Sequence, residues 1–114
     1  MGGGGLTCGV SDAFAALEHP VTVIGVQSDG CPLWPRALAA GGPVSLTPQT
    51  IADGTTAPFD AKMFERLRQG VAEWIAVPED LVRRAVVQLI KDVKVVAEGC
   101  GRAGLCRDVR GRWQ

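Results

Sequence analysis

Residues 2–26 read GGGGLTCGVSDAFAALEHPVTVIGV, a run of glycines followed by two apolar patterns of different period. Large apolar residues recur every three or four positions from Leu6 to Leu17, which predicts a helix over residues 6–18 with one apolar face. Pro20 ends it, because the residue before a proline disfavours helical backbone. Residues 21–26 form a nearly continuous apolar run, typical of a strand buried on both faces of a parallel sheet. Glycine loop, helix and buried strand in this order indicate an α/β fold.

The rest of the sequence continues this alternation. Residues 31–40 predict a short helix entered through prolines, and residues 47–60 predict a long loop, a feature that is often functional in a compact domain. A second amphipathic helix is expected around residues 63–71, followed by a buried strand at residues 73–77. Pro78 and the acidic pair after it open the last predicted helix, whose apolar stripe runs from Leu81 to Val93.

Length and composition favour one globular domain. The chain has 114 residues, of which 46% are hydrophobic and 21% charged. Twelve basic residues balance twelve acidic ones, so neither nucleic acid nor a membrane surface is an expected partner. No apolar run approaches the roughly 18 residues of a membrane-spanning helix, and the start lacks the pattern of a signal peptide. We therefore expect a cytoplasmic protein with its four cysteines reduced.

The charges are unevenly distributed. Residues 102–114 hold four arginines against a single aspartate, whereas the preceding residues are slightly acidic. We therefore expect two regions, a folded part at residues 1–101 and a divergent Arg-rich tail at residues 102–114 that does not pack as a helix on the sheet.

The four glycines are the first candidate for chemistry. They precede a helix start, where free backbone N–H groups and the helix dipole attract anions, and glycine lets a phosphate approach the main chain. A flexible glycine tag is the alternative. A nucleoside-triphosphate loop would need Gly-Lys-Ser or Gly-Lys-Thr, and a dinucleotide fold would need an acid where Gln27 stands. Both nucleotide interpretations are disfavoured.

Four motifs occur in an order that resembles a known family, at residues 2–6 (GGGGL), 23–27 (VIGVQ), 50–54 (TIADG) and 95–99 (VVAEG). The chain resembles the pyridoxal-phosphate-dependent threonine and serine dehydratases, also called ammonia-lyases, over residues 2–101. The resemblance implies part of the three-layer open parallel sheet of the tryptophan-synthase-β-like enzymes of fold type II. It also implies a role in isoleucine biosynthesis or threonine catabolism, and a homo-oligomeric full-length protein.

The resemblance also implies which residues contact the cofactor, pyridoxal 5′-phosphate. Residues of the glycine motif would hold its phosphate: Gly2, Gly3, Gly4, Gly5 and Leu6. Asp53 and Gly54 would line the pocket, although an Asp-Gly turn explains the same pair. Glu98 and Gly99 would lie beside the ring, and a solvated carboxylate at a helix end is the alternative.

A metal site is not expected. Some family members bind a divalent cation through an acid at the position of Gln27 and a second acid six residues later, where this chain has Leu33. A leucine cannot be a ligand, and an amide is a weaker ligand than a carboxylate.

The catalytic residues of the family have no counterpart here. The family uses a lysine in Schiff-base linkage, upstream of the glycine loop, to remove the α-proton before water is eliminated from an L-threonine or L-serine substrate. Lys62, Lys91 and Lys94 match no such motif. The chain is therefore expected to be a fragment of such a lyase, inactive alone. A serine racemase-like fragment and a non-catalytic module that docks on a companion chain are the alternatives.

Overall fold

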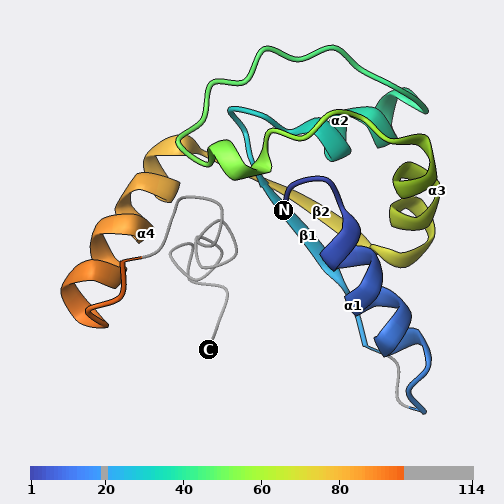
Figure 1. The fold of residues 1–114 in the computed structure, drawn as a ribbon, viewed down its shortest axis with the longest axis horizontal. Helices are drawn as coiled ribbons and strands as arrows, with labels where there is room; N and C mark the ends of the chain where they lie inside the picture. The colour runs from blue at the N-terminus through green and yellow to red at the C-terminus, as the bar shows by residue number, and fades with distance from the viewer. Residues whose placement is uncertain (19–20, 97–114) are drawn as a thin grey trace.

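The computed structural model describes residues 1–18 and 21–96. Helices and two short strands alternate along these residues, with one 3-10 turn, η1, in the long loop (Figure 1). The elements are α1 (Gly5–Ala15), β1 (Ile24–Ser28), α2 (Leu33–Ala40), η1 (Asp53–Thr55), α3 (Ala61–Gly70), β2 (Glu73–Val77) and α4 (Glu79–Asp92).

The strands β1 and β2 lie side by side and parallel, with Ile24 opposite Glu73 and Ser28 opposite Val77. Parallel neighbours need a crossover, and here α2, the long loop and α3 provide it. In Figure 1, α4 lies on the other side of the strands from α2 and α3. The predicted α/β class with a parallel sheet is confirmed.

The core consists of two apolar clusters on opposite faces of the sheet. Trp74 of β2 packs against the larger cluster, while Ile75 and Val77 contribute to the smaller one, as expected for side chains that alternate along a strand. The larger cluster is formed by Cys8, Leu33, Trp34, Ala37, Phe64, Leu67 and Val71. Helix α4 supplies Val82 and Ala85 to the smaller one.

The predicted β2 is confirmed to the residue, whereas β1 begins later than expected. The chain pairs with β2 only from Val23, whose carbonyl accepts the N–H of Ala72 at 2.9 Å. Val21 is exposed and lies outside the strand. The apolar run at residues 21–26 therefore marked a strand, but the position of its partner set where the strand begins.

The predicted apolar face of α1 does not pack against the described part of the chain. Leu6 is 84% exposed, and the other large residues of that face are also exposed. The helix instead contacts α3 through small residues, because Cys8 and Ser11 are the buried ones and the Ser11 hydroxyl donates to the Gly70 carbonyl at 2.8 Å. Small side chains allow the two helices to approach closely, so the face of α1 that packs on α3 is not the apolar face of the sequence pattern.

The last predicted helix is confirmed as α4, but its buried stripe is shorter than expected. Val82 and Ala85 are buried, whereas Ile90 and Val93 are exposed. No helix among residues 1–18 and 21–96 is long and apolar enough to cross a membrane. The predicted change of pattern at Arg102 lies outside the described residues.

Candidate functional site

The glycine loop, residues 2–5, leads directly into α1. Gly4 adopts a left-handed conformation, with φ of 96°, and Gly5 begins the helix. Within the described chain, no side chain caps this helix start and no acidic residue lies in its first turn. The free N–H groups and the positive end of the helix dipole therefore remain available to an anion.

The glycines of this loop differ in what surrounds them. A β-carbon on Gly2 would lie 2.8 Å from the Gly54 carbonyl oxygen, and one on Gly4 would lie 2.9 Å from Cδ1 of Leu67. A β-carbon on Gly5 would meet no atom within 4 Å. Gly2 is thus required by packing against backbone and Gly4 by its left-handed conformation, whereas Gly5 leaves main chain open to a ligand.

The 50–54 motif lies against the glycine loop. A β-carbon on Gly2 would also lie 3.5 Å from Cα of Thr55, so the structure brings together two segments separated by some fifty positions of sequence. Asp53 opens η1, and its carboxylate accepts the N–H of Gly54 at 2.9 Å. This contact fits the Asp-Gly turn, which is the alternative interpretation of the pair. A cofactor contact by Asp53 stays a prediction.

Glu79, which the sequence analysis considered only as a favourable acid at a helix start, holds the 50–55 segment in place. Its carboxylate accepts hydrogen bonds from the Ser28 hydroxyl at the end of β1 and from the Thr50 hydroxyl. It also accepts the N–H of Ile51 at 3.1 Å. Glu79 therefore ties the end of β1 to the segment that contacts the glycine loop.

These contacts determine the charge state of Glu79. Partial burial is the largest single influence and raises the pKa, but the hydrogen bonds from Ser28, Thr50 and Ile51, together with the charge of Arg83, outweigh it. The pKa of Glu79 is therefore lower than its ordinary value. The side chain is ionised at neutral pH, as its three donors require.

Gln27 and Leu33 take up positions that do not fit a cation site. Gln27 is completely buried, and both ends of its amide bind within the protein. Leu33 belongs to the larger apolar cluster. These two side chains therefore do not provide the oxygen ligands that a divalent cation would need.

The remaining predicted site residues are placed as follows. Leu6 follows the loop in the first turn of α1 with its side chain exposed. Glu98 and Gly99 lie outside the described residues. Lys62 is exposed on α3, Lys91 is exposed on α4, and the Lys94 ammonium donates to the Lys91 carbonyl at 2.7 Å. None of the three lysines belongs to the glycine loop or to the 50–55 segment.

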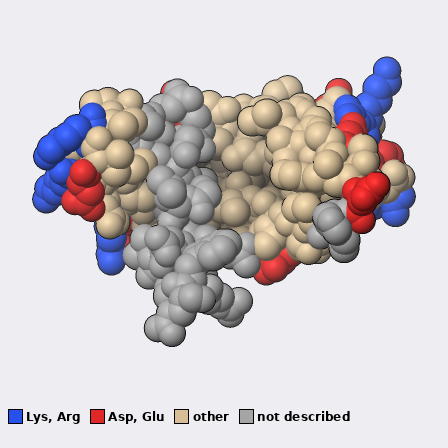
Figure 2. Space-filling model, turned by 90° about the horizontal axis from the view of Figure 1, so that it is seen from below, with Lys and Arg blue, Asp and Glu red and all other residues tan. Residues whose placement is uncertain are grey.

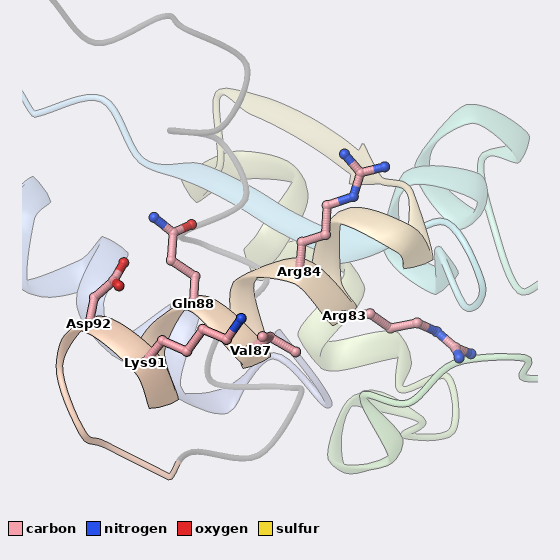
Figure 3. Close-up of a pocket in the computed structure, with 6 residues that line it drawn as sticks. All are labelled: Arg83, Arg84, Val87, Gln88, Lys91 and Asp92. Atoms are coloured by element: carbon pink, nitrogen blue, oxygen red, sulfur yellow. The ribbon is translucent and has the colours of Figure 1, made fainter.

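A hollow of about 450 Å³ along α4 is separate from this site. Its described lining comes from one helix (Figure 3) and consists of Arg83, Arg84, Val87, Gln88, Lys91 and Asp92. Figure 2 shows that charged side chains lie mostly toward the two ends of the face drawn, α4 forming one of them. The described surface between the two ends is mostly uncharged.

Comparison with known sequences now identifies the family. Residues 1–107 match the pyridoxal-phosphate dependent enzyme family. The chain belongs to this family. The family match confirms pyridoxal phosphate as the predicted cofactor of the family, and the glycine loop lies within the matched region.

Curated relatives include several dehydratases. An L-threonine ammonia-lyase of Thermotoga maritima is 35% identical over 98% of this chain. A phenylserine dehydratase of Ralstonia pickettii is 36% identical over 86%, and a catabolic L-threonine dehydratase of Escherichia coli is 33% identical over 89%. The chain spans about 30% of the length of these relatives.

Solved structures agree with the fold. A threonine deaminase from T.th. superimposes with a TM-score of 0.87 at 32% identity, over 96% of this chain and 41% of that protein. Maize serine racemase superimposes with a TM-score of 0.86 at 28% identity, over 93% of this chain and 32% of that protein. The fold is therefore part of a fold type II pyridoxal-phosphate enzyme domain, as the sequence predicted.

Proposed function

We propose that these residues form the phosphate-binding part of a pyridoxal-phosphate-dependent lyase that acts on L-threonine or L-serine. Such an enzyme eliminates water from the hydroxy amino acid and releases a 2-oxo acid and ammonia. The observation that carries the proposal is the glycine loop, which leaves main chain open at Gly5 at an uncapped helix start. The threonine-specific names of several relatives support the choice of substrate class.

The chain's own residues account for binding and not for proton transfer. Free N–H groups at the start of α1 would hold the cofactor phosphate, and the 50–55 segment would border the pocket. The bound cofactor supplies an electron sink for cleavage at the α-carbon. None of Lys62, Lys91 and Lys94 lies in the glycine loop or the 50–55 segment, so the base that removes the α-proton would be a lysine elsewhere in the full-length protein.

Binding of a cofactor analogue tests this proposal. We suggest 4-deoxypyridoxine 5′-phosphate, which keeps the ring and the phosphate but has no aldehyde to react with surface lysines. The same ring without phosphate is the control ligand. We expect the phosphorylated ligand to bind and Gly5→Val to weaken it at least about tenfold, because the side chain blocks approach to the backbone. Equal binding of both ligands would contradict the proposal.

A serine racemase fragment is the second candidate, supported by the close superposition on the maize enzyme. The two candidates differ in product once the chain is part of an active protein. D-serine formed from L-serine would favour the racemase, and pyruvate as the main product would favour the lyase.

A further inference from the structure

Two completely buried polar side chains hold the beginning of the glycine loop. Gln27, in β1, donates from its amide nitrogen to the Met1 carbonyl at 3.0 Å. Trp34, in α2, donates from its indole nitrogen to the Gly2 carbonyl at 2.7 Å. Two consecutive peptide carbonyls at the entry to the loop are therefore fixed from two different elements.

The two anchoring side chains also orient each other. The backbone N–H of Trp34 donates to the amide oxygen of Gln27 at 2.9 Å. This contact assigns the oxygen of the Gln27 amide to Trp34 and leaves the nitrogen for Met1. A carboxylate at position 27 has no donor, so it would place negative charge against the Met1 carbonyl. Residue 27 needs one donor and one acceptor, which an amide provides.

Packing alone does not explain these polar atoms. The apolar part of the Trp34 ring fills the larger cluster, but that packing does not require the indole N–H. The indole and amide donors instead satisfy carbonyls that face the core, where an unpaired acceptor is costly. The carbonyl of Gly54 lies against Gly2 and restricts the position of the loop from another direction. The loop entry is thus held from both sides.

We propose that Gln27 and Trp34 are positioning residues for the phosphate-binding loop. They touch no ligand; they fix the Met1 and Gly2 carbonyls, and through the rigid backbone they set the direction of the N–H groups at residues 3–5. A loop held in the binding geometry before the ligand arrives binds more tightly, because no ordering entropy is lost on binding. This inference rests on the proposed phosphate-binding role of the loop.

Trp34→Phe is the decisive variant, because it keeps an aromatic ring in the core and removes the indole donor to Gly2. We expect its affinity for 4-deoxypyridoxine 5′-phosphate to fall roughly three- to tenfold, the effect of one lost hydrogen bond. Val82→Ala is the matched control. It creates a cavity in the smaller cluster, which does not contain the glycine loop, and should leave that affinity unchanged. Both are measured at a temperature where each variant is fully folded.

A measurement without ligand separates this inference from the proposed function. Backbone amide signals of Gly3, Gly4 and Gly5 are compared by ¹⁵N NMR in the wild type, in Trp34→Phe and in Val82→Ala. We expect the three signals to shift or broaden in Trp34→Phe and to stay in place in Val82→Ala. Gln27→Met, which removes both amide bonds at similar volume, should reproduce the Trp34→Phe pattern and serves if that variant fails to fold.

The outcomes are distinct. Glycine amides that respond equally in Val82→Ala and in Trp34→Phe would overturn the positioning role. The glycine amide signals could change in Trp34→Phe while the wild type shows no phosphate-dependent binding. This result would keep the positioning role and reject the proposed function. If Trp34→Phe weakens binding but leaves the glycine amide signals unchanged, Trp34 does not act through the loop, and the inference is also overturned.

Discussion

Gly54 presents its carbonyl oxygen to Gly2, 2.8 Å from the point where a β-carbon on Gly2 would stand. The two residues belong to two of the three motifs that the sequence analysis assigned to the cofactor pocket. Their contact depends on Glu79, which holds the neighbouring Thr50 and Ile51. A small set of polar contacts therefore determines the shape of the proposed phosphate site.

Gly2→Ala and Gly5→Ala should differ in their effect on stability. We expect Gly2→Ala to lower the free energy of unfolding by about 1–3 kcal/mol, because the new methyl group meets the Gly54 carbonyl. Gly5→Ala meets no atom and should leave stability unchanged or slightly higher. Urea unfolding of the two variants checks this. A Gly5→Ala variant less stable than Gly2→Ala would contradict the assignment of roles within the loop.

Two leucine substitutions test the orientation of α1. Leu67→Ala should lower the free energy of unfolding by about 2–5 kcal/mol, because Leu67 is buried in the larger cluster. Leu6→Ala should change it by less than about 0.5 kcal/mol, because Leu6 is 84% exposed. Thermal unfolding of both variants provides the measurement. A similar loss in the two would mean that the face of α1 bearing Leu6 is packed.

The lowered pKa of Glu79 predicts acid sensitivity. A carboxyl whose pKa is lower in the folded than in the unfolded state stabilises the fold above the ordinary value of 4.5, and this stabilisation is lost as the pH falls from there through the lowered pKa. Glu79→Gln should cost about 1–3 kcal/mol at neutral pH, because its amide nitrogen cannot accept the Ile51 N–H. It should also flatten the acid part of the stability profile.

Asp80→Asn is the matched control for Glu79. Asp80 lies next to Glu79 but pairs with Arg84 on the exposed surface, at 2.9 Å. Its substitution should cost less than about 1 kcal/mol. Urea unfolding between about pH 3 and pH 7 compares the two variants. An acid profile that Asp80→Asn flattens and Glu79→Gln leaves intact would refute the role of Glu79.

The described cysteine thiols should resist modification. Cys8 and Cys31 are buried, and burial is the main cause that raises the pKa of each thiol. We expect both to react at least about tenfold more slowly with a disulfide reagent in the native state than in denaturant. A Cys100→Ser/Cys106→Ser variant isolates the two thiols for this measurement. Equal rates in both conditions would show that the packing around the two thiols opens readily.

The chain alone should not turn over its proposed substrates. With pyridoxal phosphate added, we expect no 2-oxobutanoate from L-threonine and no pyruvate from L-serine, because none of Lys62, Lys91 and Lys94 lies in the glycine loop or the 50–55 segment. A full-length threonine dehydratase assayed in parallel is the positive control. Sustained turnover by the purified chain would require a catalytic base among its own residues and would contradict this prediction.

Local patterns were sufficient to predict the elements. The proline before Glu79 and the apolar period after it placed the start of α4, and the apolar run at residues 73–77 placed β2. These features depend on neighbours in sequence, through backbone restriction and side-chain alternation. The family motifs likewise identified the glycine loop. The predicted roles of Glu98, Gly99 and the tail at residues 102–114 lie outside the described residues.

Long-range contacts decided what local patterns left open. The spacing of Leu6 and Phe14 showed that α1 has an apolar face, but only the approach of α3 to Cys8 and Ser11 determined which face is buried. Similarly, a glutamine at position 27 is ambiguous in sequence, because its role depends on which donors and acceptors surround it. Side-chain periodicity is a property of one segment, whereas burial and hydrogen bonding depend on residues brought together by folding.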